Sequence, residues 1–236
     1  MRTKQTELKL EKEKHPALAK TKRILLPHLS VQLSDINSPN RTDVERYISS
    51  QFYNNHQAKI NNFLPYILSA QTSKKITSTI GFRLAKPEQD LFLEQYLDKT
   101  ADIILGQHLI QKIDRKKIAE IGNLTSSYPG SSQMLFVLII SILHQAGLQW
   151  ALFTATDQVR KMIESLGISC LDICDADSER LTDSHHSWGN YYKKKPKVIA
   201  GNLSAAYEKL KKHDVAGFMI NNYQKIIHQI AQRIDI

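Results

Sequence analysis

The sequence predicts an α/β fold in which a mixed, mainly antiparallel sheet is flanked by helices. Segments with strand-type and helix-type hydrophobic patterns alternate along the chain, and the later ones follow the order strand, helix, strand, helix, strand. The chain has 236 residues, of which 42% are hydrophobic, and it contains only 9 Gly and 7 Pro. This size and composition are typical of one globular domain with or without appendages, and they exclude collagenous and low-complexity proteins.

Local signals indicate five elements in the first half of the chain. Thr42 and Glu45 have the spacing of a capping box, in which two side chains satisfy free amides at the start of a helix. Pro65 stops a second, short helix. The expected elements are a strand at 31–33, helices at 43–53 and 58–64, and strands at 76–84 and 118–124. The insertion between the last two strands, with helix-like stretches over 91–98 and onward to Ile113, is too long for a simple hairpin.

The second half contains the most apolar helix of the chain. A turn over residues 126–132 leads into this helix at 132–145, and Gly147 closes it. Thr156 can cap a further helix, which ends at Gly167. The remaining strands are expected at 150–154, 168–173 and 198–200. Helices between these strands would cover the sheet.

Three regions differ in charge and define the expected domain organisation. The net charge is +9 and the isoelectric point about 9.4, yet residues 31–192 carry a net charge of −2. The excess positive charge lies in residues 1–30, with +5, and 193–236, with +6. We expect a basic N-terminal arm at 1–30, a domain at 31–203 and an amphipathic helical extension at 204–236. That extension packs on the domain or, alternatively, offers a surface to a partner subunit or a membrane.

The cysteines and the hydropathy pattern bear on location and metal binding. Cys170 and Cys174 cannot form a disulfide framework, and free thiols suit a reducing compartment. The longest apolar run, 134–143, is about half the length that crosses a bilayer, and the charged N-terminus has no apolar signal-peptide core. We therefore expect a cytoplasmic protein. The spacing of the two cysteines, His185 and His186 fits no common zinc motif, so no metal is expected.

Two stretches contain residue types that favour binding or catalysis. The turn at 126–132 precedes a helix whose N-terminal amides and dipole can hold a phosphate, although an ordinary strand-to-helix turn explains it equally well. Glu120 is flanked by apolar residues, and nearby Gly122 leaves room beside the strand for a ligand or another backbone. Such a carboxylate either forms an ion pair, with Arg83 as one candidate, or has a raised pKa suited to a general base. The ion pair is the more common outcome.

Two further groups are charged. Glu94 and Asp98 are four residues apart, so on a helix they share a face that can bind an amine or an arginine, or simply meet solvent. The lysines of 193–197 follow the aromatic residues of 188–192. Such a combination can bind nucleic acid, hold the phosphates of a nucleotide-containing cofactor, or anchor a strand whose lysines face water.

An ordered series of short motifs resembles one protein family. The motifs, in chain order, are GFRLA at 81–85, LFLEQYLD at 91–98, EIGNL at 120–124, FTAT at 153–156, WGNYY at 188–192 and PKVIAG at 196–201. Over about residues 40–203 the chain resembles the bacterial thermostable hemolysin family. That family is similar to the acyl-CoA N-acyltransferase fold, which GCN5-type acetyltransferases and acyl-homoserine-lactone synthases share. The resemblance implies an N-acyltransferase-like fold for the domain.

The resemblance also implies where a site would lie. In that fold the strand before the central helix separates from its neighbour, the acyl thioester binds in the gap, and the pyrophosphate of coenzyme A lies on the amides of the following turn. By this likeness Glu120 is the base or the amine ligand, and Asn123 positions the acceptor. Contacts to the acyl donor would come from Leu124, Thr125, Tyr128, Gly130, Ser131 and Ser132, and contacts to the substrate from Arg83, Glu94, Asp98 and Trp188. The turn has one glycine where acetyltransferases have several, which makes an acyl-carrier-protein donor, with its single phosphate, credible beside acyl-CoA.

The sequence thus predicts an enzyme that moves an acyl group from acyl-CoA or an acyl-carrier protein to a small-molecule amine, without a metal. The alternative is a membrane-active or lipid-binding protein that uses the basic arm and the C-terminal extension. Haemolysis, which the family name implies, can come from a surfactant-like acylated product as easily as from the protein. Nucleic-acid binding through the lysines of 193–197 is the third and least favoured function.

Overall fold

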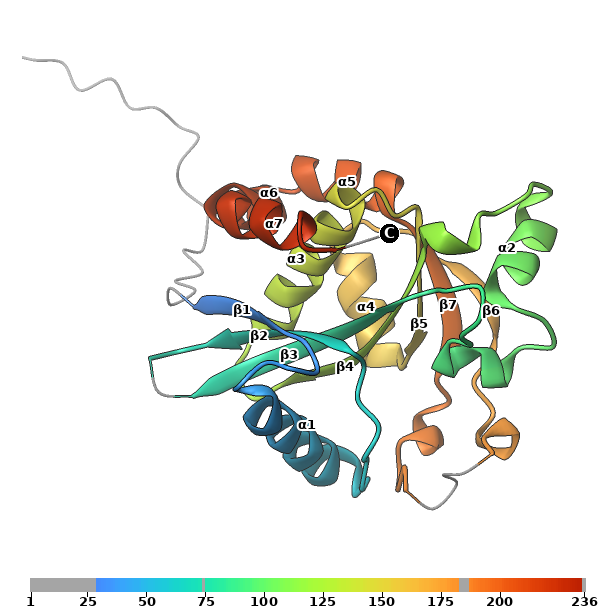
Figure 1. The fold of residues 1–236 in the computed structure, drawn as a ribbon, viewed down its shortest axis with the longest axis horizontal. Helices are drawn as coiled ribbons and strands as arrows, with labels where there is room; N and C mark the ends of the chain where they lie inside the picture. The colour runs from blue at the N-terminus through green and yellow to red at the C-terminus, as the bar shows by residue number, and fades with distance from the viewer. Residues whose placement is uncertain (1–28, 74, 183–186, 235–236) are drawn as a thin grey trace, which may run out of the picture.

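A computed structural model describes residues 29–73, 75–182 and 187–234. Its centre is a seven-stranded sheet with the strand order β1-β2-β3-β4-β5-β7-β6 (Figure 1). Five of the six strand pairs are antiparallel and only β4 and β5 run parallel, so the predicted mixed, mainly antiparallel sheet is confirmed. The strands are β1 (Ser30–Ser34), β2 (Tyr66–Gln71), β3 (Ile76–Leu84), β4 (Ile118–Ser126), β5 (Trp150–Ala155), β6 (Leu171–Asp175) and β7 (Lys197–Asn202).

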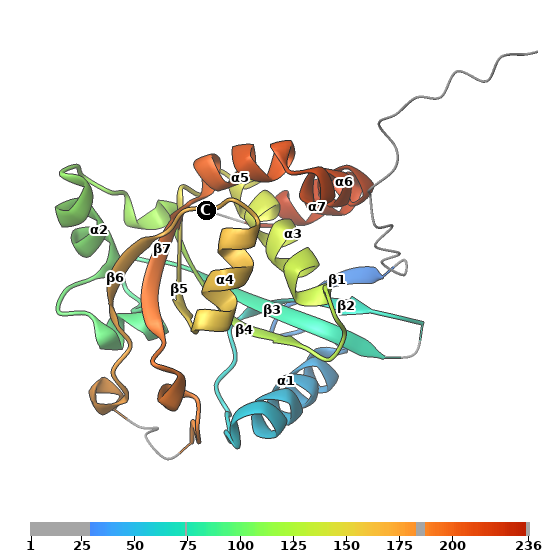
Figure 2. The same ribbon diagram turned by 180° about the vertical axis from the view of Figure 1, so that it is seen from behind.

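Helices cover both faces of this sheet. They are α1 (Arg41–His56), α2 (Ala101–Leu109), α3 (Ser131–Gln145), α4 (Asp157–Ser165), α5 (Leu203–Lys212), α6 (Asp214–Asn222) and α7 (Gln224–Ala231), with short 3₁₀ helices η1 (Phe92–Tyr96), η2 (Arg115–Lys117), η3 (Ser178–Arg180) and η4 (Tyr192–Lys194). Helix α1 lies on one face, while α3 and α4 lie on the other (Figures 1 and 2). Ile67 packs with α1 and its neighbour Leu68 with α3, as alternation along a strand requires. The residues described contain no helix that is both long and apolar enough to span a membrane.

Helix α3 is apolar around most of its circumference because it is enclosed on two sides. All residues from Met134 to Leu143 are buried, and they contact the sheet on one side and α5, α6 and α7 on the other. The C-terminal segment therefore forms three short helices rather than one. His213 has an extended backbone and accepts a hydrogen bond from the Ala216 amide, which ends α5 and begins α6. Ile227 and Ile230 of α7 belong to the same core as α3.

The segment between α1 and β2 corrects two predictions. Residues 58–64 form no helix, because the amide of Leu64 is bound by the Asn123 side chain and its carbonyl by Arg41. Helix α1 begins at Arg41, without the predicted capping box, since Glu45 pairs with the Arg41 guanidinium instead of reaching the helix start. Strand β2 was not predicted, because burial on both faces removes the alternation that marks a half-exposed strand.

Two later elements also differ from expectation. Strand β6 occupies Leu171–Asp175 rather than 168–173, because Gly167 and Ile168 still complete the end of α4 through hydrogen bonds to its carbonyls. Residues 92–96 form a 3₁₀ helix, in which side chains four apart do not share a face. Thr156 does occupy the N-cap position of α4, although its side chain makes no capping hydrogen bond.

The two parallel strands separate before either of them ends. Pairing of β4 with β5 runs from Ile118 opposite Trp150 to Ile121 opposite Phe153 and then stops. Beyond that point β4 remains paired with β3, and β5 with β7. Asn123 has a positive φ of 49°, and the β3–β4 register shifts beside it, so the strand bends where the separation begins. The sheet therefore has an opening between its two central strands.

Candidate active site

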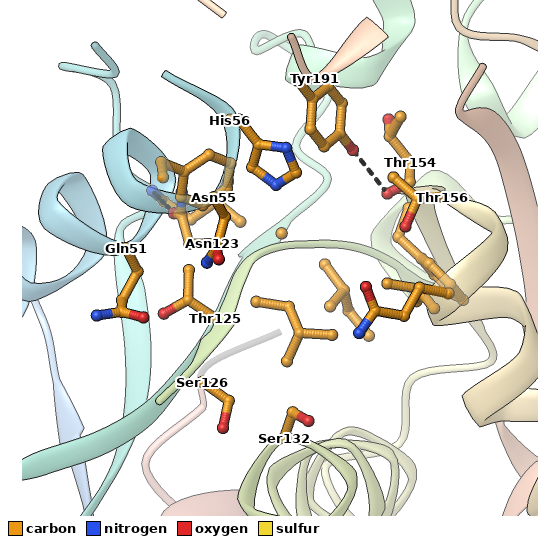
Figure 3. A pocket seen from close by; sticks show the side chains of 18 of the residues that line it. Gln51, Asn55, His56, Asn123, Thr125, Ser126, Ser132, Thr154, Thr156 and Tyr191 are labelled. Carbon is orange, nitrogen blue, oxygen red and sulfur yellow. Dashed lines mark hydrogen bonds between the residues drawn. The ribbon is translucent and has the colours of Figure 1, made fainter. Parts of the chain in front are cut away.

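A cavity of about 530 Å³ occupies the opening between β4 and β5. Residues of α1, η1 and the segment 188–194 line it on one face of the sheet, and residues of α3 and α4 line it on the other. Figure 3 shows His56 at the end of α1 and Ser132 at the start of α3 approaching the cavity from different sides, with Asn123 and Thr125 of β4 between them. The cavity thus has wall residues on both faces of the sheet, at the point where β4 and β5 separate.

Glu120 lies in this cavity and is only 4% exposed. Its two carboxylate oxygens each accept one backbone hydrogen bond at 2.9 Å, from the amides of Phe92 and Leu93 in η1. Burial raises the pKa of Glu120 to about 7, although the positive charge of Arg83 and the two amides oppose the shift. Near neutral pH this carboxylate can both take up and release a proton, as a general base must.

Arg83 is the cross-strand neighbour of Glu120 and also lines the cavity. The direct ion pair that the sequence suggested is not formed: among the residues that the structure describes, Arg83 has no salt bridge or hydrogen bond, and its Nε is buried without a partner. The charge of Arg83 acts on Glu120 only through space. Both groups therefore retain capacity for a ligand.

Asn123 is in the cavity wall, but its side chain also holds the fold together. Its Oδ1 accepts a hydrogen bond of 2.8 Å from the Leu64 amide, and its carbonyl accepts one from the Thr79 hydroxyl. The Leu64 side chain lies 3.0 Å from where a Cβ on Gly122 would be, so Leu64 fills the room that the glycine leaves. Leu124 and Thr125 line the cavity beyond this bend.

The turn before α3 divides into residues that shape it and residues that face the cavity. Gly130, in the left-handed region with φ 81°, is the N-cap, and it lines the cavity together with Ser132. The amides of Ser132 and Gln133 have no partner within the described part of the chain. Tyr128 and Ser131 lie outside the cavity wall; the Ser131 hydroxyl is buried against the Ser126 hydroxyl and the Tyr128 carbonyl.

Glu94 and Asp98 do not reach the cavity. Glu94 is part of η1 and its side chain is buried. Arg115 forms a bidentate ion pair with it at 2.6 and 2.9 Å. Burial alone would raise the pKa of Glu94, but Arg115 and the amides of Ala101 and Leu91 outweigh burial and lower it. Asp98 is exposed and pairs with Arg180 at 2.7 Å. Both carboxylates thus have arginine partners within the protein.

His56 is a cavity residue that the sequence patterns did not reveal. Its Nδ1 is buried without a partner in the described chain, and burial together with the charge of Lys194 lowers its pKa, so the ring is neutral near pH 7. The segment 188–194 closes the cavity beside it, and the Asn190 amide donates to the His56 carbonyl. Gly189 permits this approach, because a Cβ there would lie 2.3 Å from that carbonyl oxygen.

Aromatic residues form the rest of this wall, including the predicted Trp188. Tyr191 donates a hydrogen bond to the Thr154 carbonyl at 3.4 Å (Figure 3), and the hydroxyls of Tyr96 and Tyr192 bind each other. Burial raises the pKa of Tyr192 to about 12, so its hydroxyl stays protonated. In the sequence, the proximity of WGNYY to the lysines and its place in the family-like motif series signalled residues 188–192.

No group of three or more metal-binding side chains occurs in the described ranges. Burial raises the pKa of the Cys170 thiol to about 11, which disfavours the thiolate that a metal requires. His185 and His186 lie outside the described residues, as do residues 1–28 of the predicted basic arm at 1–30.

Three solved structures with similar folds share little sequence with this chain. FeeM, an N-acyl amino acid synthase from uncultured soil microbes, superposes with a TM-score of 0.52 at 12% identity over 80% of this chain and 98% of its own. The CoA-dependent acyl-homoserine lactone synthase BjaI, solved with SAM and isopentyl-CoA, gives 0.53 at 10% identity over 80% and 90%. The acyl-homoserine lactone synthase LasI gives 0.51 at 10% identity over 75% and 90%. The fold is therefore N-acyltransferase-like, as the sequence predicted.

Sequence comparison gives a family but no close relative. No curated protein matches the chain significantly. The family model described as thermostable hemolysin matches residues 35–207, which is most of the chain and includes the whole cavity wall. The chain belongs to the thermostable hemolysin family.

Proposed function

We propose that this protein is an N-acyltransferase, which moves an acyl group from a thioester donor to an amine. The observation that carries the proposal is the cavity through the sheet, with Glu120 on one side and the free amides at the start of α3 on the other. Acyl transfer needs such an arrangement, because the donor and the acceptor must bind to separate surfaces while their reacting groups meet. The N-acyltransferase-like fold of FeeM, BjaI and LasI supports the same reaction class.

The donor enters on the α3 side. The amides of Ser132 and Gln133, at the positive end of the helix dipole, bind the phosphate of a phosphopantetheine arm. Phe136, Phe153 and Met162 supply apolar wall for the arm or the acyl chain. Coenzyme A and an acyl-carrier protein share this arm, so either thioester fits the site.

The acceptor enters on the α1 side and reacts at the separation of the strands. Glu120 takes a proton from the ammonium group, which frees the nitrogen lone pair to attack the thioester carbonyl carbon. A C–N bond forms and the C–S bond breaks. One of the two hydrogens left on the nitrogen then passes as a proton to the departing thiolate, which gives an amide that keeps one N–H and a free thiol, and Glu120 returns the first proton to solvent.

The test is acyl transfer by the Glu120→Gln variant. Purified protein is given decanoyl-CoA or decanoyl-acyl-carrier protein and an amine panel, and free thiol and amide product are measured. We expect Glu120→Gln to lower the rate by about 100-fold or more, because a general base contributes a factor of this size. Glu164→Gln, an exposed change outside the cavity, serves as the matched control.

The glutamine leaves one of the Phe92 and Leu93 amides poorly paired, so folding is checked by thermal unfolding of each variant. Glu120→Asp retains the charge but shortens the side chain, and we expect it to keep a measurable part of the activity. Full activity of Glu120→Gln would remove this residue from the mechanism.

A membrane-active role has less support. Ile227, Ile230 and Met219 of the C-terminal helices are buried against the core, so they offer no apolar face to a bilayer. Phe218 is 66% exposed, whereas these three residues are buried. The apolar periodicity of this segment is explained by its packing on α3.

A further inference from the structure

The α1 side of the cavity contains two opposite charges that do not neutralise each other. Arg83 on β3 and Glu120 on β4 are directly opposite in the strand register, which sets their Cβ atoms about 5 Å apart on one face of the sheet. Within the described residues neither side chain forms an ion pair, and both line the cavity. The protein thus keeps a cation and an anion side by side and open to a ligand.

Each of these groups has unused binding capacity of a defined kind. The Nε of Arg83 is buried without a partner, which is costly unless a ligand or water satisfies it. A guanidinium binds a carboxylate through two parallel hydrogen bonds, so its natural partner is a planar anion. Each Glu120 oxygen accepts one amide hydrogen bond and has a further lone pair for a donor such as an ammonium group.

We propose that the acyl acceptor is a free α-amino acid, with its carboxylate on Arg83 and its amine on Glu120. This inference rests on the proposed acyltransferase function and names its acceptor. The adjacency of the two side chains matches a molecule whose amine and carboxylate are attached to one carbon. A simple amine or a protein lysine would leave Arg83 unpaired. Phe52, Phe92 and Trp188 of the same wall favour an apolar side chain on the amino acid.

The product of this reaction is an N-acyl amino acid, in which an amide has replaced the ammonium group. The molecule has an apolar acyl chain and a free carboxylate, so it is an anionic amphiphile. Such a product supplies the surfactant through which a protein of this family can cause haemolysis without entering a membrane itself.

The first test measures binding without a donor. L-Phenylalanine and L-leucine are compared with 2-phenylethylamine and isopentylamine, which differ from them only by the carboxylate, by calorimetric titration. We expect the amino acids to bind about 10- to 100-fold more tightly, because a hydrogen-bonded pair with a charged group is worth that much. Arg83→Gln should reduce this ratio to near one. Arg46→Gln, an exposed change on α1 at a residue that pairs with Asp43, should leave this ratio unchanged.

The second test measures transfer with the same pairs and decanoyl-CoA or decanoyl-acyl-carrier protein. We expect the preference for the amino acid in kcat/KM to fall in Arg83→Gln mainly through a higher KM.

Equal use of both members of each pair by the unaltered protein would overturn the amino-acid inference while leaving acyl transfer intact. Carboxylate-dependent binding through Arg83 without any transfer would support the acceptor site and contradict the proposed reaction. Absence of carboxylate-dependent binding would overturn the inference, and thermal unfolding of each variant checks that the fold is retained.

Discussion

Two buried glutamates, Glu94 within η1 and Glu120 bonded to the η1 amides, show how the same residue type serves structure in one region and is kept for a ligand in another. Glu94 is enclosed by the Arg115 guanidinium and two amides, and its pKa is lowered. Glu120 also accepts hydrogen bonds from two amides, but its cross-strand neighbour Arg83 forms no ion pair with it, and burial raises its pKa to about 7. Burial raises the pKa of both carboxyls, but Glu94 has a hydrogen-bonded arginine that outweighs burial and Glu120 does not. The ion pair of Glu94 and Arg115, here the closed pair, stabilises the insertion. Glu120 and Arg83, the open pair, face the cavity.

The largest expected loss of stability comes from breaking the ion pair of Glu94 and Arg115. Arg115→Met leaves Glu94 buried without its cation, and we expect a loss of about 3 to 5 kcal/mol in the free energy of unfolding. Arg83→Met, which removes no ion pair or hydrogen bond within the described residues, should cost about 1 kcal/mol. Chemical denaturation of both variants measures the difference. Similar losses in the two variants would contradict the distinction between the pairs.

Substitutions at two glycines test how the aromatic segment 188–194 is attached to α1 beside the cavity. Gly189→Ala places a Cβ 2.3 Å from the His56 carbonyl oxygen, so the segment 188–194 must shift away from α1. We expect a loss of roughly 2 kcal/mol or more together with lower acceptor affinity. Gly167→Ala has a similar positive φ but no atom within 4 Å of the added Cβ, so it should cost about 1 kcal/mol and leave acceptor affinity unchanged. Thermal unfolding and acceptor titration separate the two results.

The smallest effect concerns the donor side. Ser132→Asp adds a negative charge in the first turn of α3, beside the amides assigned to the donor phosphate. We expect stability to rise by about 0.5 kcal/mol through the helix dipole and the KM for the thioester to rise about 10-fold through repulsion. Ser204→Asp occupies the equivalent position of α5, away from the cavity, and should change stability only. An unchanged KM in Ser132→Asp would place the phosphate elsewhere.

Local patterns predicted the part of the site that is local in sequence. Glu120, flanked by apolar residues, and the small-residue turn around Gly130 could be identified because each signal lies within one strand or one turn. Both line the same cavity. The order of strands and helices after residue 118 was also predictable, since each element there has its own periodicity and stop signals.

Tertiary contacts decided what the sequence could not. Arg115 is 21 residues from Glu94, so no local pattern showed that this carboxylate was already paired. His56 is far along the chain from Gly189, and only the docking of 188–194 on α1 brings them together. Residues 58–64 have a helical pattern, yet they form no helix, and Leu64 at the end of the segment is hydrogen-bonded to Arg41 and Asn123.

The two carboxyl groups should also make opposite contributions to the pH dependence of stability. The raised pKa of Glu120 gives a contribution that is complete below about pH 4.5 and is lost as the pH rises through about 7, with a size of about 3 kcal/mol. The lowered pKa of Glu94 gives a contribution that is present above about pH 4.5 and is lost as the pH falls through the lowered value.

The most direct measurement is a carbon-13 NMR titration of the glutamate side-chain carboxyls, with Glu120 assigned by its loss in Glu120→Gln. The structure predicts that the Glu120 signal titrates near pH 7 and that a buried glutamate assigned to Glu94 stays ionised to below pH 4.5. A Glu120 signal that titrates at or below pH 4.5 would show that the protein stabilises the ionised form of this carboxylate, as it does for Glu94. That result would contradict the role of Glu120 as a base.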